Sequence, residues 1–185
     1  MILREATEDD LGAVERLYCS SVDDSVVGIT ERFYLARKHG LPFVVAEEDN
    51  TVIGFTCANP FRYRGIYRFS VEESIYVAQE WRKKKVGCAL LARLIHKCTL
   101  LGLHQMVAVI ADRENTASVR LHESLGFVKV GELACVGHGQ GRCLTTVVMQ
   151  RSLAPCPQPG KVLTTYECVP PFTHTVTQLC EGLAL

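Results

Sequence analysis

The sequence has no excess charge of either sign, because 20 lysine and arginine residues balance 20 aspartate and glutamate residues. A neutral chain gives no global reason to expect a nucleic-acid or anionic-membrane partner. The sequence also lacks a run of about 18 apolar residues, the minimum for a helix that crosses a bilayer. Residues 1–5 show neither the basic nor the long apolar region of a signal peptide. These absences favour a cytoplasmic protein without nucleic-acid or membrane partners.

Close cysteine pairs are absent as well, although the chain has nine cysteines. An odd number of cysteines without a C-x-x-C pair favours reduced thiols over a disulfide framework or a zinc site. Inside a strand or helix, a free cysteine behaves as a small apolar residue. Five cysteines lie in such patterns: Cys57, Cys88, Cys98, Cys135 and Cys143. We therefore expect free thiols and no metal.

The 185 residues, 48% of them hydrophobic, suffice for one core and predict one domain. Period-2 and period-3.6 apolar patterns alternate along the chain. We expect strands at residues 2–5, 43–47, 51–58, 69–77, 106–111, 129–136 and 144–151. We expect helices near residues 10–18, 30–39, 86–101 and 116–125. Strands mixed with helices and hairpins predict an α/β fold around one mixed sheet.

The composition changes after Leu153, where five of the seven prolines lie and no periodicity persists. We expect a folded domain over residues 1–151. Residues 152–185 are predicted to form an appended Pro-rich tail, to which the sequence assigns no role.

Residues 114–127 read Glu-Asn-Thr-Ala-Ser-Val-Arg-Leu-His-Glu-Ser-Leu-Gly-Phe. Asn115 can cap a helix that Gly126 ends. Upstream, residues 71–77 read Val-Glu-Glu-Ser-Ile-Tyr-Val. This succession of strand, basic turn, helix, strand and Asn-led helix resembles the GNAT N-acetyltransferase superfamily. The L-H-E-x-L-G-F ending is similar to that of its phosphinothricin (L-methionine sulfoximine/sulfone) acetyltransferase group.

The resemblance covers about residues 2–150 and implies a GNAT-type acyl-CoA N-acyltransferase fold. In that fold, helices flank a mixed central sheet that is splayed between its fourth and fifth strands. The implied co-substrate is acetyl-CoA, without a metal.

Residues 79–88 join the fourth strand to the next helix and contain four consecutive cations. Cations at a helix start oppose the macrodipole, so a bound anion there would relieve the repulsion. The alternative is a solvated basic patch. The resemblance implies that this turn holds the coenzyme A pyrophosphate and that three residues of the fourth strand pair with the pantetheine arm. The implied cofactor-binding residues are Ile75, Tyr76, Val77, Arg82, Lys83, Lys84, Lys85, Val86, Gly87, Cys88 and Asn115.

Lys85 departs from the family pattern, which has glycine at its position. A non-glycine residue with positive φ costs on the order of 1 kcal/mol, and its side chain crowds a close backbone approach. Lys85 therefore favours weakened cofactor binding, which its charge partly offsets.

Two carboxylates, Glu72 and Glu73, lie on opposite faces of the fourth strand by strand alternation. The family pattern V/A-E-x-S/T-x-Y-V implies that Glu72 is the general base; the alternative is a salt-bridged strand carboxylate. The resemblance also implies that His122 assists proton transfer. An imidazole titrates near neutrality, which suits that role. A purely structural histidine is the alternative.

The loop at residues 61–67 is basic and aromatic. By resemblance, Arg62, Arg64 and Tyr67 are candidate contacts to an anionic acceptor, since a guanidinium binds a carboxylate or phosphinate through paired hydrogen bonds. The alternative is an exposed basic loop. Three departures from the family bear on the acceptor: a short segment between the first two helices, the Arg142-Cys-Leu-Thr stretch, and Cys57 at a position that is often aromatic.

These features favour transfer of an acetyl group from acetyl-CoA to a small amino-acid-like acceptor of the phosphinothricin or methionine sulfone type. One alternative is an acetyltransferase for protein N-termini or polyamines. Another is an acyl-CoA-binding protein with weak or no catalysis. The sequence leaves open whether the protein is a homodimer.

Overall fold

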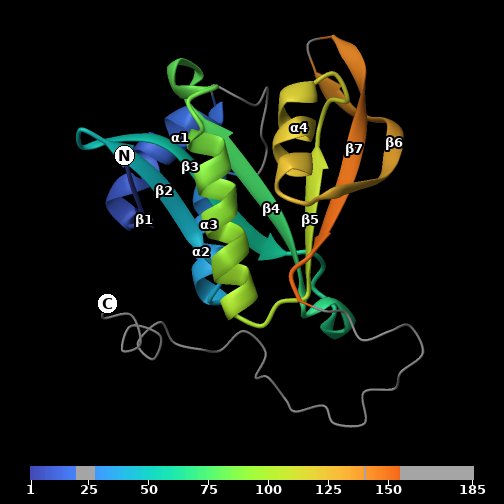
Figure 1. Ribbon diagram of the computed structural model, residues 1–185, viewed down its shortest axis with the longest axis horizontal. Coiled ribbons are helices and arrows are strands. Elements are labelled where there is room, and N and C mark those ends of the chain that lie inside the picture. Colours follow the sequence, from blue (N-terminus) through green and yellow to red (C-terminus); the bar gives the residue numbers. More distant parts are fainter. Residues whose placement is uncertain (20–27, 140, 155–185) are drawn as a thin grey trace.

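The computed structural model describes residues 1–19, 28–139 and 141–154 of the 185-residue chain. It contains a seven-stranded sheet in the order β1-β2-β3-β4-β5-β7-β6 (Figure 1). The strands are β1 Ile2–Glu5, β2 Phe43–Glu48, β3 Thr51–Pro60, β4 Ser70–Val77, β5 Gln105–Ile110, β6 Val128–Gly139 and β7 Arg142–Ser152. Only β4 and β5 run parallel among these described strands. The expected mixed sheet is confirmed.

Helices cover both faces of the sheet. On one face lie α1 (Leu11–Cys19) and α2 (Ile29–Lys38), which contact β3. On the other lie α3 (Val86–Leu100), which crosses β2, β3 and β4, and α4 (Thr116–Ser124), which packs on β5. Figure 1 shows α3 in front of the sheet with α2 behind it. This is the helix-flanked α/β fold that the sequence predicts.

The sheet is splayed between β4 and β5. These strands pair over only four residues, from Ser70 opposite Gln105 to Glu73 opposite Ala108. β4 continues to Val77, but beyond Glu73 it pairs with β3 alone. The remainder of β4 therefore presents unpaired backbone groups on its β5 side. We call the Glu73–Ala108 pair the vertex of the splay, and the expected opening is confirmed.

Local sequence signals explain the ends of these elements. The β2–β3 hairpin turns at Asp49 and Asn50, whose φ values of 47° and 60° suit a two-residue turn with φ above zero at both positions. Helix α4 ends at Ser124, and Gly126, two residues later, has a φ of 80°, which is inexpensive only for glycine. Strand β6 differs most from the expectation: it reaches Gly139 and not residue 136.

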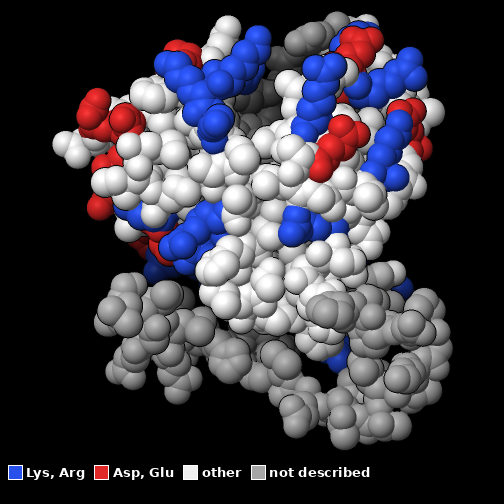
Figure 2. All heavy atoms as spheres, in the orientation of Figure 1, with Lys and Arg blue, Asp and Glu red and all other residues white. Residues whose placement is uncertain are grey.

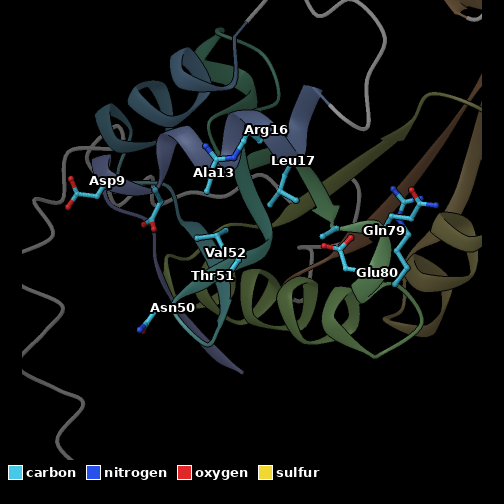
Figure 3. A pocket seen from close by; sticks show the side chains of 12 residues that line it. Asp9, Ala13, Arg16, Leu17, Asn50, Thr51, Val52, Gln79 and Glu80 are labelled. Carbon is cyan, nitrogen blue, oxygen red and sulfur yellow. The ribbon is translucent and has the colours of Figure 1, made fainter.

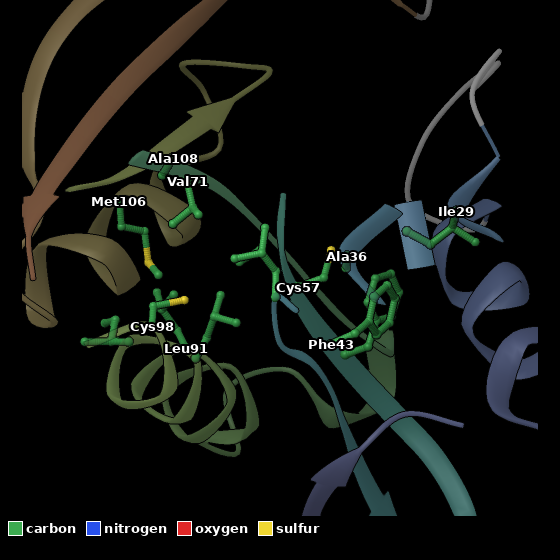
Figure 4. Packing of buried hydrophobic residues seen from close by; sticks show 14 of the residues in the cluster. Ile29, Ala36, Phe43, Cys57, Val71, Leu91, Cys98, Met106 and Ala108 are labelled. Atoms are coloured by element: carbon green, nitrogen blue, oxygen red, sulfur yellow. The ribbon is translucent and has the colours of Figure 1, made fainter. Parts of the chain in front are cut away.

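The core consists of apolar side chains from both helical layers and the strands between them. Ile29 and Ala36 come from α2, whereas Leu91 and Cys98 come from α3 (Figure 4). Phe43, Phe55 and Tyr76 stack in sequence, with ring centroids 5.5 Å and 4.9 Å apart. The core therefore holds β3 and β4, which carry the candidate site, from both sides.

The cysteine expectation is right for some residues and wrong for one pair. Cys57, Cys88 and Cys98 are free thiols. Cys135 and Cys143, however, form a disulfide between β6 and β7, with Cα atoms 5.1 Å apart. The strand pattern placed each cysteine in a strand but did not show that the hairpin returns one beside the other. An irregular stretch of β6 between Leu133 and Gly137, which contains Cys135, sets this register.

The fold extends to Leu153, two residues past the expected domain boundary. Its N–H donates to the His104 carbonyl at 2.9 Å, and its side chain packs on the core. The expected tail beyond residue 154 and the segment at residues 20–27 between α1 and α2 lie outside the described residues. None of the described helices is long and apolar enough to cross a membrane.

Candidate active site

Strand β4 distributes its side chains between two environments. Ser74 accepts a hydrogen bond from Arg32 Nη1 of α2 at 3.1 Å, and the Tyr76 ring lies 5.1 Å from that of Tyr18 in α1. Glu73, on the opposite face, bonds to His122 of α4. The alternation predicted from the sequence therefore holds without a bulge at Glu72 and Glu73. Glu72 faces α1 and α2, and Glu73 faces α3 and α4.

Glu72 is a half-buried carboxylate that forms no ion pair within the described part of the chain. Burial raises the pKa of Glu72 above its ordinary 4.5, an effect that the positive charges of Arg32 and Arg62 oppose and the charge of Glu73 adds to. A carboxylate without a cationic partner is able to accept a proton. The described residues therefore do not support the alternative in which Glu72 is a salt-bridged strand carboxylate.

His122 is buried, with only 1% of its surface exposed. Its Nε2 lies 2.8 Å from Glu73 Oε1, and its Nδ1 lies 2.7 Å from the Ser118 carbonyl. Phe127 packs edge-on against the ring at 5.0 Å. Burial alone would lower the pKa of His122, but the hydrogen bond and charge of Glu73 and the Ser118 carbonyl outweigh it and raise the pKa above 6.5. Sequence reasoning did not foresee Glu73 as the partner.

The basic turn precedes α3 at the open end of β4. Figure 2 shows Lys and Arg side chains gathered where α3 begins in Figure 1. The first-turn N–H groups of a helix lack intrahelical acceptors, so they point toward this basic region. Lys85 is the residue before α3 and has a φ of 66°, while Lys83 has a φ of 62°. The left-handed backbone expected from the glycine of the family pattern is thus adopted here by lysine.

Helix α3 approaches α4 and β4 closely at Gly87. A Cβ at this position would lie 3.3 Å from Leu121 Cδ2 and 3.7 Å from Val77 Cγ2. Helix α4 starts at Asn115, whose Oδ1 accepts the Ser118 N–H at 3.1 Å. The predicted helix cap is confirmed. The cap also fixes Ser118, whose carbonyl holds His122.

The candidate acceptor residues differ in their relation to Glu72. Arg62 stacks on the Phe61 ring at 4.6 Å, and its charge acts on Glu72. Tyr67, in the short turn η2 (Gly65–Tyr67), contacts Phe61 edge-on at 5.8 Å. Arg64 is exposed and makes no ion pair or hydrogen bond through its side chain with any described residue. The structure therefore associates Arg62 with Glu72, but not Arg64.

Arg32 is a site residue that sequence reasoning missed. It lies on α2 between Ile29, Phe33 and Ala36, whose side chains are buried. An arginine at the edge of a buried stripe was the available signal, because its head group must reach a polar partner or the solvent. Arg32 has no carboxylate partner among the described residues, and its charge acts on Glu72.

A cavity of about 580 Å³ lies apart from these groups. It is bounded by α1, the β2–β3 turn and residues 78–82, with Ala13, Arg16 and Leu17 facing Val52 (Figure 3). It is not lined by Glu72, Glu73 or His122. Its wall includes Arg82, the first cation of the basic turn. No three His, Cys, Asp or Glu side chains form a metal-binding group in the portion that the structure describes.

Residues 6–127 match the model of the Acetyltransferase (GNAT) family. The parallel β4–β5 pair, the splay and the basic turn before α3 lie within that range. The chain belongs to the GNAT family of acetyltransferases.

Several curated relatives are similar to this chain in sequence. The chain is 36% identical over 161 residues to a phosphinothricin N-acetyltransferase from Alcaligenes faecalis, covering 82% of each chain. It is 36% identical to an L-methionine sulfoximine/L-methionine sulfone acetyltransferase from Salmonella typhimurium, covering 83% of this chain and 95% of the relative. It is 33% identical to an L-amino acid N-acyltransferase from Escherichia coli, covering 88% and 99%.

Two solved structures are similar over most of the fold. A structure from Salmonella typhimurium that contains acetyl-CoA as its cofactor has a TM-score of 0.80 and 32% identity, covering 88% of this chain and 99% of that one. A phosphinothricin acetyltransferase from Sinorhizobium meliloti in complex with acetyl-CoA has a TM-score of 0.79 and 37% identity, covering 90% and 95%.

Proposed function

We propose that this protein transfers an acetyl group from acetyl-CoA to the amine of a small amino-acid-like acceptor, with Glu72 as general base. The observation that carries the proposal is the position of Glu72. It is a half-buried carboxylate without an ion pair in the described chain, and it lies on β4 next to Glu73, the last residue of β4 that pairs with β5. The relatives named for acetylating phosphinothricin and methionine analogues support the acceptor class.

The residues around the splay fit acetyl-CoA. On β4, the backbone of Ile75, Tyr76 and Val77 is not paired with β5, so it can bond to the amides of a pantetheine arm. The basic turn and the first-turn N–H groups of α3 suit a pyrophosphate. Gly87 lets the start of α3 pack closely against Leu121 of α4 and Val77 of β4, which a side chain at this position would crowd. The coenzyme supplies the acetyl group as an activated thioester.

Direct transfer requires an amine without its extra proton and a stabilised oxyanion. The raised pKa of Glu72 makes this carboxylate a stronger base than an ordinary glutamate. Unpaired N–H groups of β4 beyond the vertex are suited to polarise the thioester carbonyl. Glu72 and the opened strand thus provide the two requirements from adjacent positions.

The charges near Glu72 favour an anionic acceptor. Arg32 and Arg62 both act on Glu72, and Arg32 has no carboxylate partner among described residues. A guanidinium next to the base can hold a carboxylate or phosphinate while the amine faces the thioester. The same charges would repel a polyamine. They argue against that alternative and leave a protein N-terminus less favoured.

One observation favours a second candidate function, acyl-CoA binding with little catalysis. Lys85 has a φ of 66°, a conformation that is unfavourable for lysine in the turn expected to hold the pyrophosphate. If this turn binds acetyl-CoA in a displaced position, the rate of acetyl transfer falls although the coenzyme still binds.

A direct experiment separates these functions. The purified full-length protein is given acetyl-CoA and a panel of acceptors: amino acids, methionine sulfone, phosphinothricin, polyamines and a peptide with a free N-terminus. Release of free thiol is measured together with acetyl-CoA affinity by calorimetry. We expect turnover with the anionic amino-acid analogues. Acetyl-CoA binding without turnover of any acceptor would establish the second candidate, and turnover of polyamines or the peptide alone would refute the acceptor class.

A further inference from the structure

Glu73 is a buried carboxylate to which the proposed reaction assigns no role. Only 4% of its side chain is exposed. Its Oε1 lies 2.8 Å from His122 Nε2, and its Oε2 has no hydrogen-bond partner among the described residues. A buried charge is strongly unfavourable unless a partner compensates it. His122 is the only described group that compensates Glu73.

The contacts of His122 define where its protons lie. The Ser118 carbonyl, 2.7 Å from Nδ1, can only accept a hydrogen bond, so Nδ1 carries a proton. The 2.8 Å contact between Nε2 and Glu73 then contains one more proton. With that proton on nitrogen, the pair is an imidazolium and a carboxylate. The raised pKa of His122 is in keeping with this form.

The titratable groups around the pair add little charge of their own. Burial raises the pKa of the Cys57 thiol on β3, the Cys98 thiol on α3 and the Tyr76 hydroxyl on β4, so all three are neutral near pH 7. Glu72 is on the other face of β4, where the charge of Glu73 contributes to raising its pKa. From β7, the Arg151 side chain reaches the end of α4 at Gly126.

The pair lies at the vertex of the splay. Glu73 makes the last β4–β5 pair, and Ile75, the next residue on the same strand face, belongs to the opened part. The α4 helix brings His122 to this point from 49 residues away in sequence. A thioester bound along the opened strand would place its sulfur near this end of the opening.

We propose that Glu73 is a positioning residue that keeps His122 doubly protonated, so that a buried imidazolium charge lies at the vertex and stabilises the departing thiolate. This inference rests on the proposed acetyl transfer. It concerns a residue at the variable position of the family's strand pattern. Glu73 itself touches no substrate in this scheme and acts through His122.

The proton balance of the step is closed. The acceptor nitrogen forms a bond to the acetyl carbon, and its proton passes to Glu72. The carbon–sulfur bond breaks and its electron pair stays on sulfur, so the coenzyme leaves as a thiolate that takes one proton from solvent. His122 keeps both of its protons, one toward the Ser118 carbonyl and one toward Glu73, and Glu73 remains a carboxylate. Glu72 releases its proton to solvent.

The test measures the charge of His122 separately from turnover. Nitrogen-15 NMR of the ring follows the His122 titration in the wild type, in Glu73→Gln and in Glu123→Gln, a matched control that changes an exposed carboxylate of α4. His122→Gln identifies the signal among the six histidines. The same proteins are assayed for kcat/KM of the acceptor against pH and for acetyl-CoA Kd.

We expect the wild-type imidazole to titrate above pH 6.5 and the alkaline limb of kcat/KM to coincide with it. Glu73→Gln should move both toward acid by about one pH unit or more. It should lower kcat about tenfold or more, since one group that stabilises developing negative charge contributes about 10²–10³-fold. Acetyl-CoA Kd should stay within about twofold, a shift of under about 0.5 kcal/mol. Glu123→Gln should change none of these.

Several results would overturn the proposal. One is a wild-type His122 that titrates below pH 6.5. Another is a shifted titration in Glu73→Gln with an unchanged rate profile, which would leave the pair a structural tie between α4 and β4. If Glu73→Gln does not fold, the wild type alone tests the proposal, which fails unless the His122 titration coincides with the alkaline limb of kcat/KM. A wild type that shows the expected titration yet acetylates no acceptor refutes the proposed function and the stabilisation of the thiolate, while the Glu73–His122 pairing stands.

Discussion

At the scale of single residues, the site depends on where charge is left uncompensated. On one face of β4, Glu72 lies near Arg32 of α2 without forming an ion pair within the described chain. On the opposite face, Glu73 and His122 of α4 neutralise each other. One face is therefore able to exchange a proton with an acceptor and hold its anion. The other face holds a buried ion pair in a fixed position.

Glu72→Gln should lower kcat by about 10²–10⁴-fold, because an amide cannot accept the amine proton. Acetyl-CoA Kd should change by less than about twofold, since the proposed contacts of β4 to the cofactor use backbone groups. Steady-state kinetics and calorimetry check both, with Glu31→Gln, an exposed carboxylate on α2, as the control. A variant with full kcat would exclude Glu72 as the base.

Arg32→Ala should raise the KM for anionic acceptors by about 10–100-fold, the value of one charge-assisted hydrogen bond of about 1.5–3 kcal/mol. Arg64→Ala should have little effect, because Arg64 is exposed and does not act on Glu72. Amino-acid amides, which lack the anion, should be poor acceptors that Arg32→Ala barely changes. Equal losses for charged and amidated acceptors would refute the anion clamp.

Lys85→Gly should leave acetyl-CoA affinity intact or tighten it. The substitution removes backbone strain on the order of 1 kcal/mol, although glycine adds freedom to the unfolded chain. Lys84→Gly is the matched control, since it removes the same charge from a residue without positive φ. Calorimetry of both variants is decisive: a much larger loss for Lys85→Gly would show that Lys85 itself binds the phosphates.

At the scale of elements, α4 connects helix capping to the chemistry. Asn115 caps the helix at Ser118, Ser118 holds His122 Nδ1, and His122 Nε2 reaches Glu73 on β4. The first turn of α4 therefore sets the position of the imidazole. Loss of the Asn115 cap should therefore disturb the position of His122 at the vertex of the splay.

Asn115→Ala should lower the free energy of unfolding by about 1 kcal/mol, the usual cost of losing a cap. It should also reduce kcat, because Ser118 no longer holds His122 firmly. Asn115→Ser restores a cap and should recover most of both, as urea denaturation and kinetics would show. If the serine variant is stable but inactive, the Asn115 amide contacts the cofactor in addition to capping.

At the scale of the whole molecule, two buried ionisable clusters should make stability depend on pH in opposite directions. Arg4 lowers the pKa of Asp10 from 3.8 to about 2, through hydrogen bonds at 2.7 Å and 2.8 Å. A lowered carboxylate pKa contributes stability above pH 3.8 that is lost as the pH falls through about 2. Glu73 raises the pKa of His122 above 6.5, so its contribution is present below pH 6.5 and lost as the pH rises through the raised value.

The free energy of unfolding should therefore be highest between about pH 4 and pH 6.5 and decline on both sides. Denaturant unfolding at about pH 2.5, 5.5 and 8.5 would measure the free energy of unfolding in each of the three regions. Asp10→Asn should flatten the acid decline only, by at most about 2 kcal/mol because Arg4 is partly exposed. Glu73→Gln should flatten the alkaline decline only. If the acid decline persists in Asp10→Asn and the alkaline decline persists in Glu73→Gln, other groups cause the pH dependence of stability.

The sequence by itself determined the elements and the faces of β4. Apolar periodicity, the Asp49–Asn50 turn, the Asn115 cap and Gly126 are local signals, and each energy depends on neighbours a few residues away. The resemblance of residues 71–77 and 114–127 to a known superfamily then indicated the fold, the splay and the acetyltransferase class. The basic turn before α3 was visible in the same way.

Only the tertiary structure decided which distant groups meet. Glu73 and His122 are 49 residues apart, and Arg32 and Ser74 are 42 apart. The Cys135–Cys143 disulfide depends on the register of a bulged hairpin. Such contacts depend on how α2, α4 and the strands pack, and no local propensity encodes that packing. Burial in that packing also sets the protonation of Glu72 and His122, because desolvation and a partner's charge act only after the chain has folded.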